Sequence, residues 1–370
     1  LFRFLPFFLL IYYVTPQKWK NAVLFAGSIL FYTAGEAEYV VLLLASVVIN
    51  YVFGRLMYRD TYEGRGKKQL ILLIVALCYD FGVLFLFKYS GFMDKLPLGI
   101  SFYTFQIAAY IIDVYRGRVP VEKSFIRLGT YVTMFPQLIA GPIVRFQSVQ
   151  AELKHREITW EKNGDGAARF VCGLCKKVLI ADSLATFVQT LQNISETAAK
   201  TEAVVTTGIR AEGAGIGTLG YWVLALAFML QLYYDFSGYS DMAIGIALLL
   251  GFHFNINFDS PYKSASITEF WRRWHISLSS WLRDYLYISL GGNRKGKIRQ
   301  YANLIITMFR GGLWHGASWN FVLWGMMHGV ALAAHKFWMT LTGRKKGTES
   351  HGIHRFFGVL VTFHFVCFCW

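Results

Sequence analysis

Long apolar runs recur along this chain of 370 residues. The clearest approach the roughly 20 residues that a helix needs to cross a bilayer, and they cover 39–57, 70–89, 221–252, 320–338 and 356–370. Shorter or mixed runs occupy 1–14, 22–32, 97–114 and 128–144. Charged residues make up only 16% of the chain, whereas a soluble domain carries about a quarter. We therefore predict an all-α, multi-pass integral membrane protein with roughly eight to ten embedded helices, some short, tilted or re-entrant.

Basic residues give the chain a formal net charge of +15, and they gather at the ends of the apolar runs. The main groups lie at 65–68, 154–156, 176–177, 295–299 and 344–346. This placement is typical of cytoplasmic loops, where lysine and arginine mark the inner face of a membrane protein. A basic chain can also attract nucleic acid, but charges beside membrane segments favour the first interpretation. We expect a lipid bilayer around the protein and no nucleic-acid partner.

No linker divides the chain, so residues 1–370 are expected to form one membrane domain. Both ends interrupt apolar runs, which predicts a domain truncated at both ends. The stretch 147–167 is charged and is predicted to be a polar cytoplasmic loop that leads into a helix. The stretch 193–220 is rich in Thr, Ala and Gly and lacks basic clusters, which favours a flexible loop on the outer face.

The segment 266–290 has the pattern of an amphipathic helix. Ser266 followed by Glu269 is a capping-box pattern that starts a helix. Aromatic and apolar residues then recur at steps that place them on one helical face, namely Trp271, Trp274, Leu278, Trp281 and Tyr285. His275 borders this stripe. We predict a helix that lies at the membrane interface or lines a polar cavity near the catalytic residues.

A titratable imidazole, His315, stands in the apolar stretch GGLWHGASWNF at 311–321. Ionisable side chains inside a membrane are costly and indicate function by default, although a histidine satisfied by one hydrogen bond is an equally good structural interpretation. A neutral imidazole accepts a hydroxyl proton at cellular pH, and the oxygen can then attack a thioester carbonyl. Charge that develops in this step needs a second donor. His275 is the expected donor and His328 a weaker alternative, while the neighbouring glycines permit close backbone approach.

Metal catalysis is not expected. His315, His328 and His335 lack the spacing of a zinc-binding helix and have no adjacent carboxylate. Cys172 and Cys175 have C-x-x-C spacing, but no second pair completes a metal site, so helix packing is the expected role. We predict no metal and no bound cofactor.

A second polar cluster lies in YYDFSGYSDMAIG, residues 233–245. Asp235 and Asp241 need partners within an apolar run. Structural ion pairing is favoured over direct catalysis. The candidate partners are Arg272, Arg273, Arg283 and Arg310.

Long composite motifs in this chain resemble the membrane-bound O-acyltransferase (MBOAT) family. They are FWRRWHISLSSWLRDYLYISLGGNRKG, GGLWHGASWNFVLWGMMHG, YYDFSGYSDMAIG, GISFYTFQ, FPQLIAGPIVRF and KKVLIADSLA, which together extend over nearly the whole chain. The resemblance is closest to the bacterial polysaccharide branch of the alginate O-acetylase type. The D-alanyl branch of teichoic-acid modification shares RWH and WHG but usually lacks a segment like LGGNRKG, so acetyl transfer is favoured.

The resemblance implies a ring of membrane helices around a thin centre, with funnels from both faces. It implies that His315 is the general base and His275 the supporting histidine of an O-acyltransferase. The acyl group, expected to be acetyl, would pass from a cytoplasmic thioester (acetyl-CoA or a carrier-bound donor) to an exported cell-surface polysaccharide. An extracytoplasmic acetyltransferase partner protein and a location in the bacterial plasma (inner) membrane are implied. Residues expected in the substrate tunnel are Trp274, Trp314, Arg272, Asp235, Tyr239, Ser237 and Asn293.

A transporter for a polyanionic chain or a lipid-linked sugar is the alternative of a different class. Asp235, Asp241 and the arginines would then form its pathway. Transporters often contain inverted repeats with broken helices in matching positions, and no such symmetry is present in this sequence. The enzyme is therefore the favoured interpretation.

Overall fold

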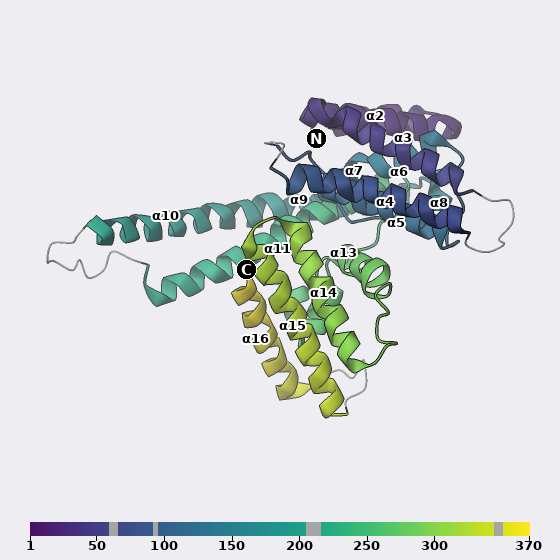
Figure 1. Cartoon of the computed structure of the whole chain (residues 1–370). Coiled ribbons are helices and arrows are strands. Elements are labelled where there is room, and N and C mark those ends of the chain that lie inside the picture. The colour runs from purple at the N-terminus through teal and green to yellow at the C-terminus, as the bar shows by residue number, and fades with distance from the viewer. Residues whose placement is uncertain (59–65, 92–94, 205–215, 344–350) are drawn as a thin grey trace.

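The computed structural model describes residues 1–58, 66–91, 95–204, 216–343 and 351–370, with side chains omitted for 198–204. Every regular element in these ranges is a helix, in agreement with the predicted fold class (Figure 1). The N-terminal helices are α1 (Phe4–Val14), α2 (Lys20–Glu36), α3 (Val40–Leu56), α4 (Lys67–Lys88), α5 (Ile100–Tyr115), α6 (Phe125–Thr133), α7 (Phe135–Leu138) and α8 (Phe146–Lys154). The later helices are α9 (Trp160–Cys175), α10 (Asp182–Val204), α11 (Gly217–Leu249), α12 (Ile267–Arg273), α13 (Ile276–Trp281), α14 (Lys297–His315), α15 (Trp319–Leu341) and α16 (Gly352–Cys369).

Several of these helices suit a bilayer. By length and apolar composition, four stretches of the described chain could span a membrane: 17–56, Lys67–Lys88, Gly217–Leu249 and Gly352–Cys369. Large apolar side chains point outward from the bundle, where lipid would cover them; Phe368, for example, is 79% exposed. These features confirm a helical membrane protein.

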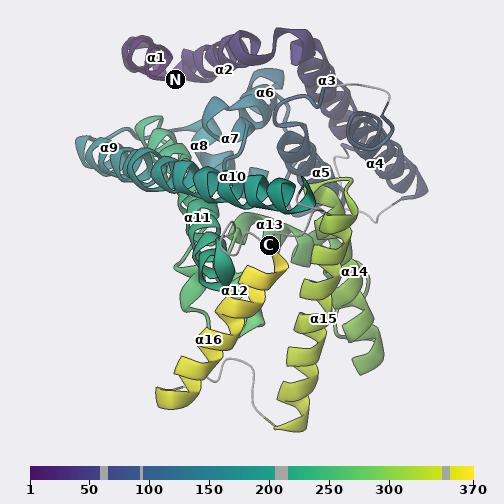
Figure 2. The same cartoon turned by 90° about the vertical axis from the view of Figure 1, so that its left-hand side faces the viewer.

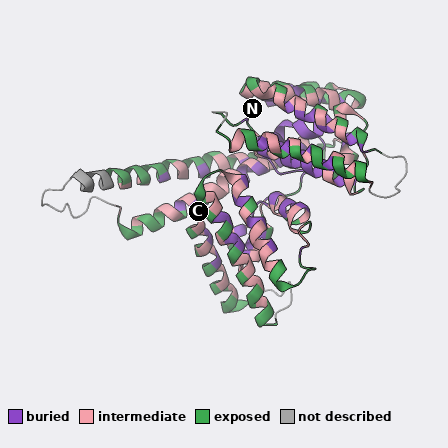
Figure 3. Ribbon diagram, viewed as in Figure 1, coloured by how far each residue is buried: buried purple, intermediate pink, exposed green. Residues whose placement is uncertain are grey.

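The helices form two groups, and the long helices α9, α10 and α11 lie beside them. α1 to α8 pack together at one end, and α12 to α16 form a second group (Figures 1 and 2). Between them, α9 continues through a short π-helical segment, η3 (Lys176–Ala181), into α10. α5 is buried along most of its length, and buried residues are concentrated around it (Figure 3).

Two pairs of glycines bring α9 and α11 into close contact. Gly166 lies against Gly245, and Gly173 lies against Gly238. A Cβ atom built on Gly173 would lie 2.6 Å from the carbonyl oxygen of Gly238, and one on Gly238 would lie 2.8 Å from that of Gly173. Small residues at such crossings let membrane helices pack backbone to backbone. Within the CGLC sequence the packing residue is thus Gly173, because Cys172 and Cys175 are exposed.

Replacing Gly238 with alanine is expected to destabilise the protein by about 1–3 kcal/mol, because the added methyl group forces the helices apart. Gly82 on α4 is a matched control, since a Cβ there meets nothing within 4 Å. Gly82→Ala should leave stability unchanged or raise it slightly. Apparent Tm values in detergent would measure both effects, and equal values for the two variants would contradict this account of the crossing.

The structure corrects the predicted loops. Residues 147–154 are helical within α8, and α9 begins at Trp160, so only 155–159 connects two helices in the predicted loop 147–167. The predicted flexible loop 193–220 is also largely wrong, because α10 continues to Val204 and α11 begins at Gly217. Residues 205–215 lie outside the described residues. Polar composition was misleading here, because helices that leave the apolar layer can be polar on most of their surface.

The predicted amphipathic helix 266–290 is broken into shorter pieces. Ser266 does cap α12, since its Oγ accepts a hydrogen bond from the backbone N–H of Glu269. The helix ends at Arg273, and α13 with its π-helical continuation η5 (Leu282–Tyr287) begins only at Ile276. The break falls at His275.

Candidate active site

The backbone at His275 is in the left-handed region, with φ of 42°. A non-glycine residue in this conformation costs of order 1–3 kcal/mol and persists only where the surroundings enforce it. Two hydrogen bonds accepted by Asn257 hold the backbone in this conformation. Its carbonyl oxygen accepts from the backbone N–H of Ile276, and its side-chain Oδ1 accepts from the backbone N–H of Ser277. The chain therefore holds His275 at a fixed corner between α12 and α13.

The same asparagine determines which ring nitrogen of His275 carries the proton. Oδ1 of Asn257 must be an acceptor, because the Ser277 N–H can only donate to it. Nδ1 of His275 lies 3.2 Å from this oxygen and therefore carries the proton. The remaining nitrogen, Nε2, is buried and has no hydrogen-bond partner among the described residues. In the neutral ring Nε2 is the atom left for further chemistry.

His315 is the last residue of α14, and aromatic rings surround it. Its ring centroid lies 5.0 Å from that of Trp314 and 4.9 Å from that of Trp324. The ring of Trp370 in the C-terminal segment is 6.2 Å away. Unlike His275, which is 1% exposed, His315 is only half-buried.

Close helix packing brings this aromatic group together. A Cβ atom on Gly312 would lie 2.2 Å from the carbonyl oxygen of Phe321 and 3.1 Å from the Cα atom of Gly325. The backbone of α15 therefore approaches α14 one turn before His315. The prediction that glycines beside His315 allow close backbone approach is confirmed.

Trp314 joins the two histidines. Its ring centroid lies 6.1 Å from that of His275 and 5.0 Å from that of His315. The structure thus brings together residues that lie far apart in the sequence, although the indole of Trp314 and the ring of Phe236, 4.7 Å away, cover His275.

Lys88 and Tyr89, at the end of α4, hold the end of α14. Lys88 Nζ donates to the carbonyl oxygen of Trp314 and lies 3.3 Å from Ser101 Oγ. The Tyr89 hydroxyl donates to the carbonyl oxygen of Leu313. A cation at the C-terminal end of a helix complements its unpaired carbonyl groups. These bonds fix the backbone that carries His315.

Replacing Lys88 with methionine is expected to lower the rate of acyl transfer about 10–100-fold with little change in KM, because His315 loses its fixed position. Lys20→Met is a matched control. Lys20 Nζ donates to the carbonyl oxygen of Tyr12 over a distance of 2.8 Å and lies 4.3 Å from its ring centroid, a similar contact at the end of α1. The control should lower the apparent Tm and leave kcat unchanged. If kcat falls equally in both variants, Lys88 has only a general structural role.

His328 belongs to the same aromatic group. It is fully buried, and its Nδ1 accepts a hydrogen bond from Trp271 Nε1 at 3.2 Å. Its ring lies 4.6 Å from that of Trp324, the indole that also contacts His315. These contacts are those of a buried residue that packs between helices.

The other residues predicted for the tunnel, apart from Asp235, fall into three sets. Trp314 and Trp274 lie in the aromatic group, where Trp274 is 6.3 Å from the ring of Trp370. Ser237 and Tyr239 both lie on α11, and Ser237 is buried. Arg272 and Asn293 are exposed.

The predicted partners of the two aspartates are wrong. Among the described residues, Asp235 pairs with Lys177 rather than with an arginine of the 272–310 region. Asp241 pairs with Arg169 at 2.9 Å and with Lys176 at 2.6 Å. The partners come from α9 and η3 because the glycine crossing brings these elements against α11. These contacts agree with the interpretation favoured from the sequence, that the two aspartates form structural ion pairs.

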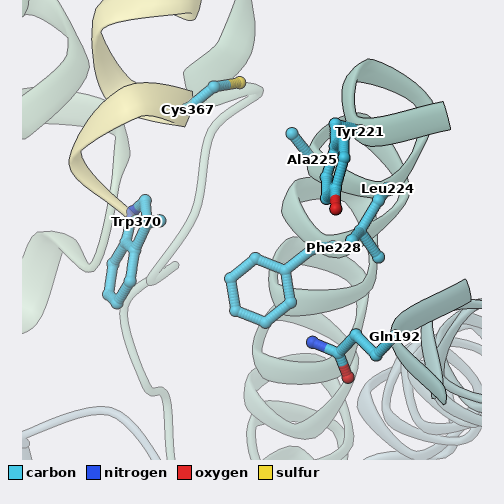
Figure 4. A pocket seen from close by; sticks show the side chains of 7 residues that line it. All are labelled: Gln192, Tyr221, Leu224, Ala225, Phe228, Cys367 and Trp370. Carbon is cyan, nitrogen blue, oxygen red and sulfur yellow. The ribbon is translucent and has the colours of Figure 1, made fainter. Parts of the chain in front are cut away.

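A cavity of about 290 Å³ approaches the aromatic group from α10, α11 and α16. Figure 4 shows Trp370 and Cys367 facing side chains of α11 across it. Its lining residues are Gln192, Tyr221, Leu224, Ala225, Phe228, Cys367 and Trp370. Because Trp370 also contacts His315, the cavity ends one ring away from that histidine.

Sequence patterns did not identify Asn257, Lys88 or Trp370. Lys88 has the position of a lysine that merely flanks an apolar run. Asn257, in HFNINFDS, is a polar residue between two apolar helices, which is a weak signal. Asn257 and Trp370 contact the histidines and Lys88 contacts the backbone of Trp314, and all three contacts depend on the tertiary fold.

The sequence profile of the "MBOAT, membrane-bound O-acyltransferase family" matches residues 119–369, which contain both histidines. The chain belongs to this family, as its motifs predicted. Among curated relatives, "Probable alginate O-acetylase AlgI" of Azotobacter vinelandii is 44% identical over 91% of this chain and 67% of its own length. "Peptidoglycan O-acetyltransferase" of Helicobacter pylori is 34% identical over 100% of this chain and 75% of its own. "Teichoic acid D-alanyltransferase" of Bacillus subtilis is 26% identical over 73% of this chain and 67% of its own.

Among these three relatives, the identity to this chain is highest for the alginate O-acetylase. The chain spans about two thirds of the length of these relatives, with shares of 67%, 65% and 64% in three of them.

Proposed function

We propose that this chain carries the acyl-transfer site of an O-acyltransferase that acetylates an exported cell-surface polysaccharide. The main observation in support of this proposal is that His275 and His315, from separate motifs, contact the same indole, that of Trp314. Family membership and the O-acetylating relatives support this reading.

In the proposed reaction, His315 is the general base and removes the proton of an acceptor hydroxyl. The oxygen then forms a bond to the thioester carbonyl carbon, and the tetrahedral intermediate collapses by breaking the carbon–sulfur bond. The thiolate takes up the proton held by His315, so that no net proton is consumed. His275 supports this step as an acceptor rather than as the donor expected from the sequence. Asn257 holds its proton at Nδ1, so Nε2 can accept a hydrogen bond from a second hydroxyl of the acceptor and orient it.

We propose further that the thioester donor, acetyl-CoA or a carrier-bound acyl group, enters from the cytoplasm. The grouping of basic residues beside membrane segments supports this orientation. The acceptor would then approach from the opposite face of a bacterial plasma membrane, with an extracytoplasmic acetyltransferase as partner protein. Two relatives whose names specify O-acetyl transfer are more similar than the D-alanyltransferases, which favours acetyl as the acyl group.

Purified protein given a donor with a labelled acetyl group tests this function against the transporter alternative. The proposal predicts covalent label on a polysaccharide acceptor and release of free thiol. Movement of unmodified sugar across vesicles, without covalent label, would instead support a transporter. The ion pairs of Asp235 and Asp241 already account for the charges that would form such a pathway.

A further inference from the structure

The packed face of α4 contains one carboxyl group, that of Asp80. The buried residues of this helix recur at steps of three and four and so form one face; they are Leu73, Ala76, Asp80 and Leu84. Asp80 is only 4% exposed, and it lies inside a helix that is long and apolar enough to span a membrane. In the described part of the chain Asp80 forms no ion pair.

Asn50 of α3 is the hydrogen-bond partner of Asp80. The helices α3 and α4 pack side by side (Figure 2), and Asn50 Nδ2 donates to Asp80 Oδ1 at 2.7 Å and to the carbonyl oxygen of Ser46 at 3.0 Å. Because the Ser46 carbonyl can only accept, the amide atom that contacts it must be the nitrogen. Both hydrogens of this nitrogen are then used. The other amide atom, Oδ1, can only accept.

Two oxygens of this pair are left without a hydrogen. Asp80 Oδ2 and Asn50 Oδ1 are buried, and neither has a partner among the described residues. The buried hydroxyl of Tyr103 on α5 has no partner there either, so it does not donate to them. An ionised carboxylate at this apolar site would be costly. One proton on Asp80 Oδ2 removes the charge and turns this oxygen into a donor, for which Asn50 Oδ1 is an unused acceptor.

The cations of the neighbouring helices lie away from Asp80. Lys88 follows it by eight residues, about 12 Å along the axis of α4, and its Nζ donates to the carbonyl oxygen of Trp314. The lysines at 67–68 are at the opposite end of α4. On α3, Arg55 is exposed near the end of the helix, and α5 contains no lysine or arginine. A neutral Asp80 therefore fits the charges on all three helices.

The helix α4 connects this pair with the acyl-transfer site. It continues without a break from Asp80 to Lys88, and Lys88 and Tyr89 bind backbone carbonyl groups of the last turn of α14, which ends at His315. Its outward face is apolar, and Ile71 is 60% exposed. Lipid tails are as apolar as this face, so apolar contact alone gives little preference for one position of α4 along α3. A polar pair between the two helices sets that position.

We infer that Asp80 is a neutral carboxylic acid that donates a hydrogen bond to Asn50 Oδ1, and that this acid–amide pair positions His315 through α4. Asp80 is thus a positioning residue and does not touch the substrate. Its effect on the rate rests on the proposed acyl transfer, whereas its proton can be detected without any activity.

Infrared spectra of the full chain in lipid vesicles at pH 7 test the proton directly. The difference between the wild type and Asp80→Asn should contain the carbonyl band of a protonated carboxylic acid. Asp241→Asn is the matched control on α11, because Asp241 pairs with Arg169 and Lys176; its difference spectrum should contain the bands of an ionised carboxylate. Carboxylate bands in the Asp80→Asn difference as well would overturn the inference.

Initial rates with a labelled acetyl donor test the positioning. Asp80→Asn should keep kcat within about twofold of the wild type, since an amide can donate to Asn50 Oδ1 and accept from Nδ2. Asp80→Leu should lower kcat about tenfold at an unchanged KM, because His315 loses its fixed position. Leu73→Ala is the control for general damage to the same buried face. It should lower the apparent Tm and leave kcat unchanged.

The positioning role is wrong if Asp80→Leu keeps the kcat of the wild type, or if Asp80→Asn loses as much as Asp80→Leu. It is also wrong if Leu73→Ala lowers kcat equally. Failure of the wild-type chain to transfer acetyl at all would refute the proposed function instead, and the infrared result would still decide whether Asp80 holds a proton.

Discussion

Replacing His315 with alanine is expected to lower the rate of acyl transfer by roughly 10²–10⁴-fold, the usual contribution of a positioned acid–base group. The other two imidazoles that contact Trp314 or Trp324, His275 and His328, are fully buried, so neither is placed to replace it as acceptor of the hydroxyl proton. The fold should persist, because His315 is half-buried and ends its helix. Initial rates with a labelled donor, together with the apparent Tm, measure both effects.

His253→Ala is the matched control for this experiment. His253 is an exposed histidine that pairs with Glu152 at 2.7 Å, so its loss should leave the rate unchanged. If His315→Ala retained a rate near that of the control, His315 would not be the base.

Replacing His275 with alanine should lower kcat by roughly 10²-fold, because the acceptor loses a group that positions it. A second, milder variant is Asn257→Ala, which keeps the imidazole of His275 but removes the acceptor that fixes its Nδ1 proton. We expect a smaller decrease of about tenfold, or about 1.4 kcal/mol in activation free energy.

Both residues are buried, so their structural contribution must be measured separately. Thermal unfolding gives the loss of stability, and kcat at a temperature well below the apparent Tm gives the loss of function. A large decrease in Tm with an unchanged kcat for His275→Ala would show that this histidine serves packing alone.

The apolar runs predicted most of the membrane helices well. The runs 39–57 and 70–89 became α3 and α4 within a few residues, because continuous apolar sequence of that length has few other stable arrangements in a bilayer. The helix α14 was not predicted. It begins with charged residues and contains Gly311 and Gly312, which lower helix propensity. The close approach of α15 nevertheless requires Gly312.

The break at His275 escaped prediction for a related reason. The aromatic stripe of 266–290 has helical periodicity throughout, and only the bonds from Asn257 reveal the left-handed corner. His275 and His315 themselves were identifiable, since each is a titratable group in apolar surroundings. Their common contact with Trp314 could not be derived from either motif alone.

The partners in the ion pairs could not be predicted from local sequence patterns either. The aspartates of YYDFSGYSDMAIG were predicted to have partners, and Asp241 does pair with Arg169 and Lys176. Nothing in the local sequence selects α9 and η3 as the source of these cations. The glycine crossing of α9 and α11 makes that selection.

The most direct test of the account uses inside-out membrane vesicles, whose cytoplasmic face is outward. Labelled acetyl-CoA, which cannot cross the membrane, is supplied outside, and the polysaccharide acceptor is enclosed in the lumen. The account predicts covalent label on the enclosed acceptor with the wild-type chain and little above background with His315→Ala. Equal labelling by the two chains, or labelling only when donor and acceptor share one compartment, would contradict it.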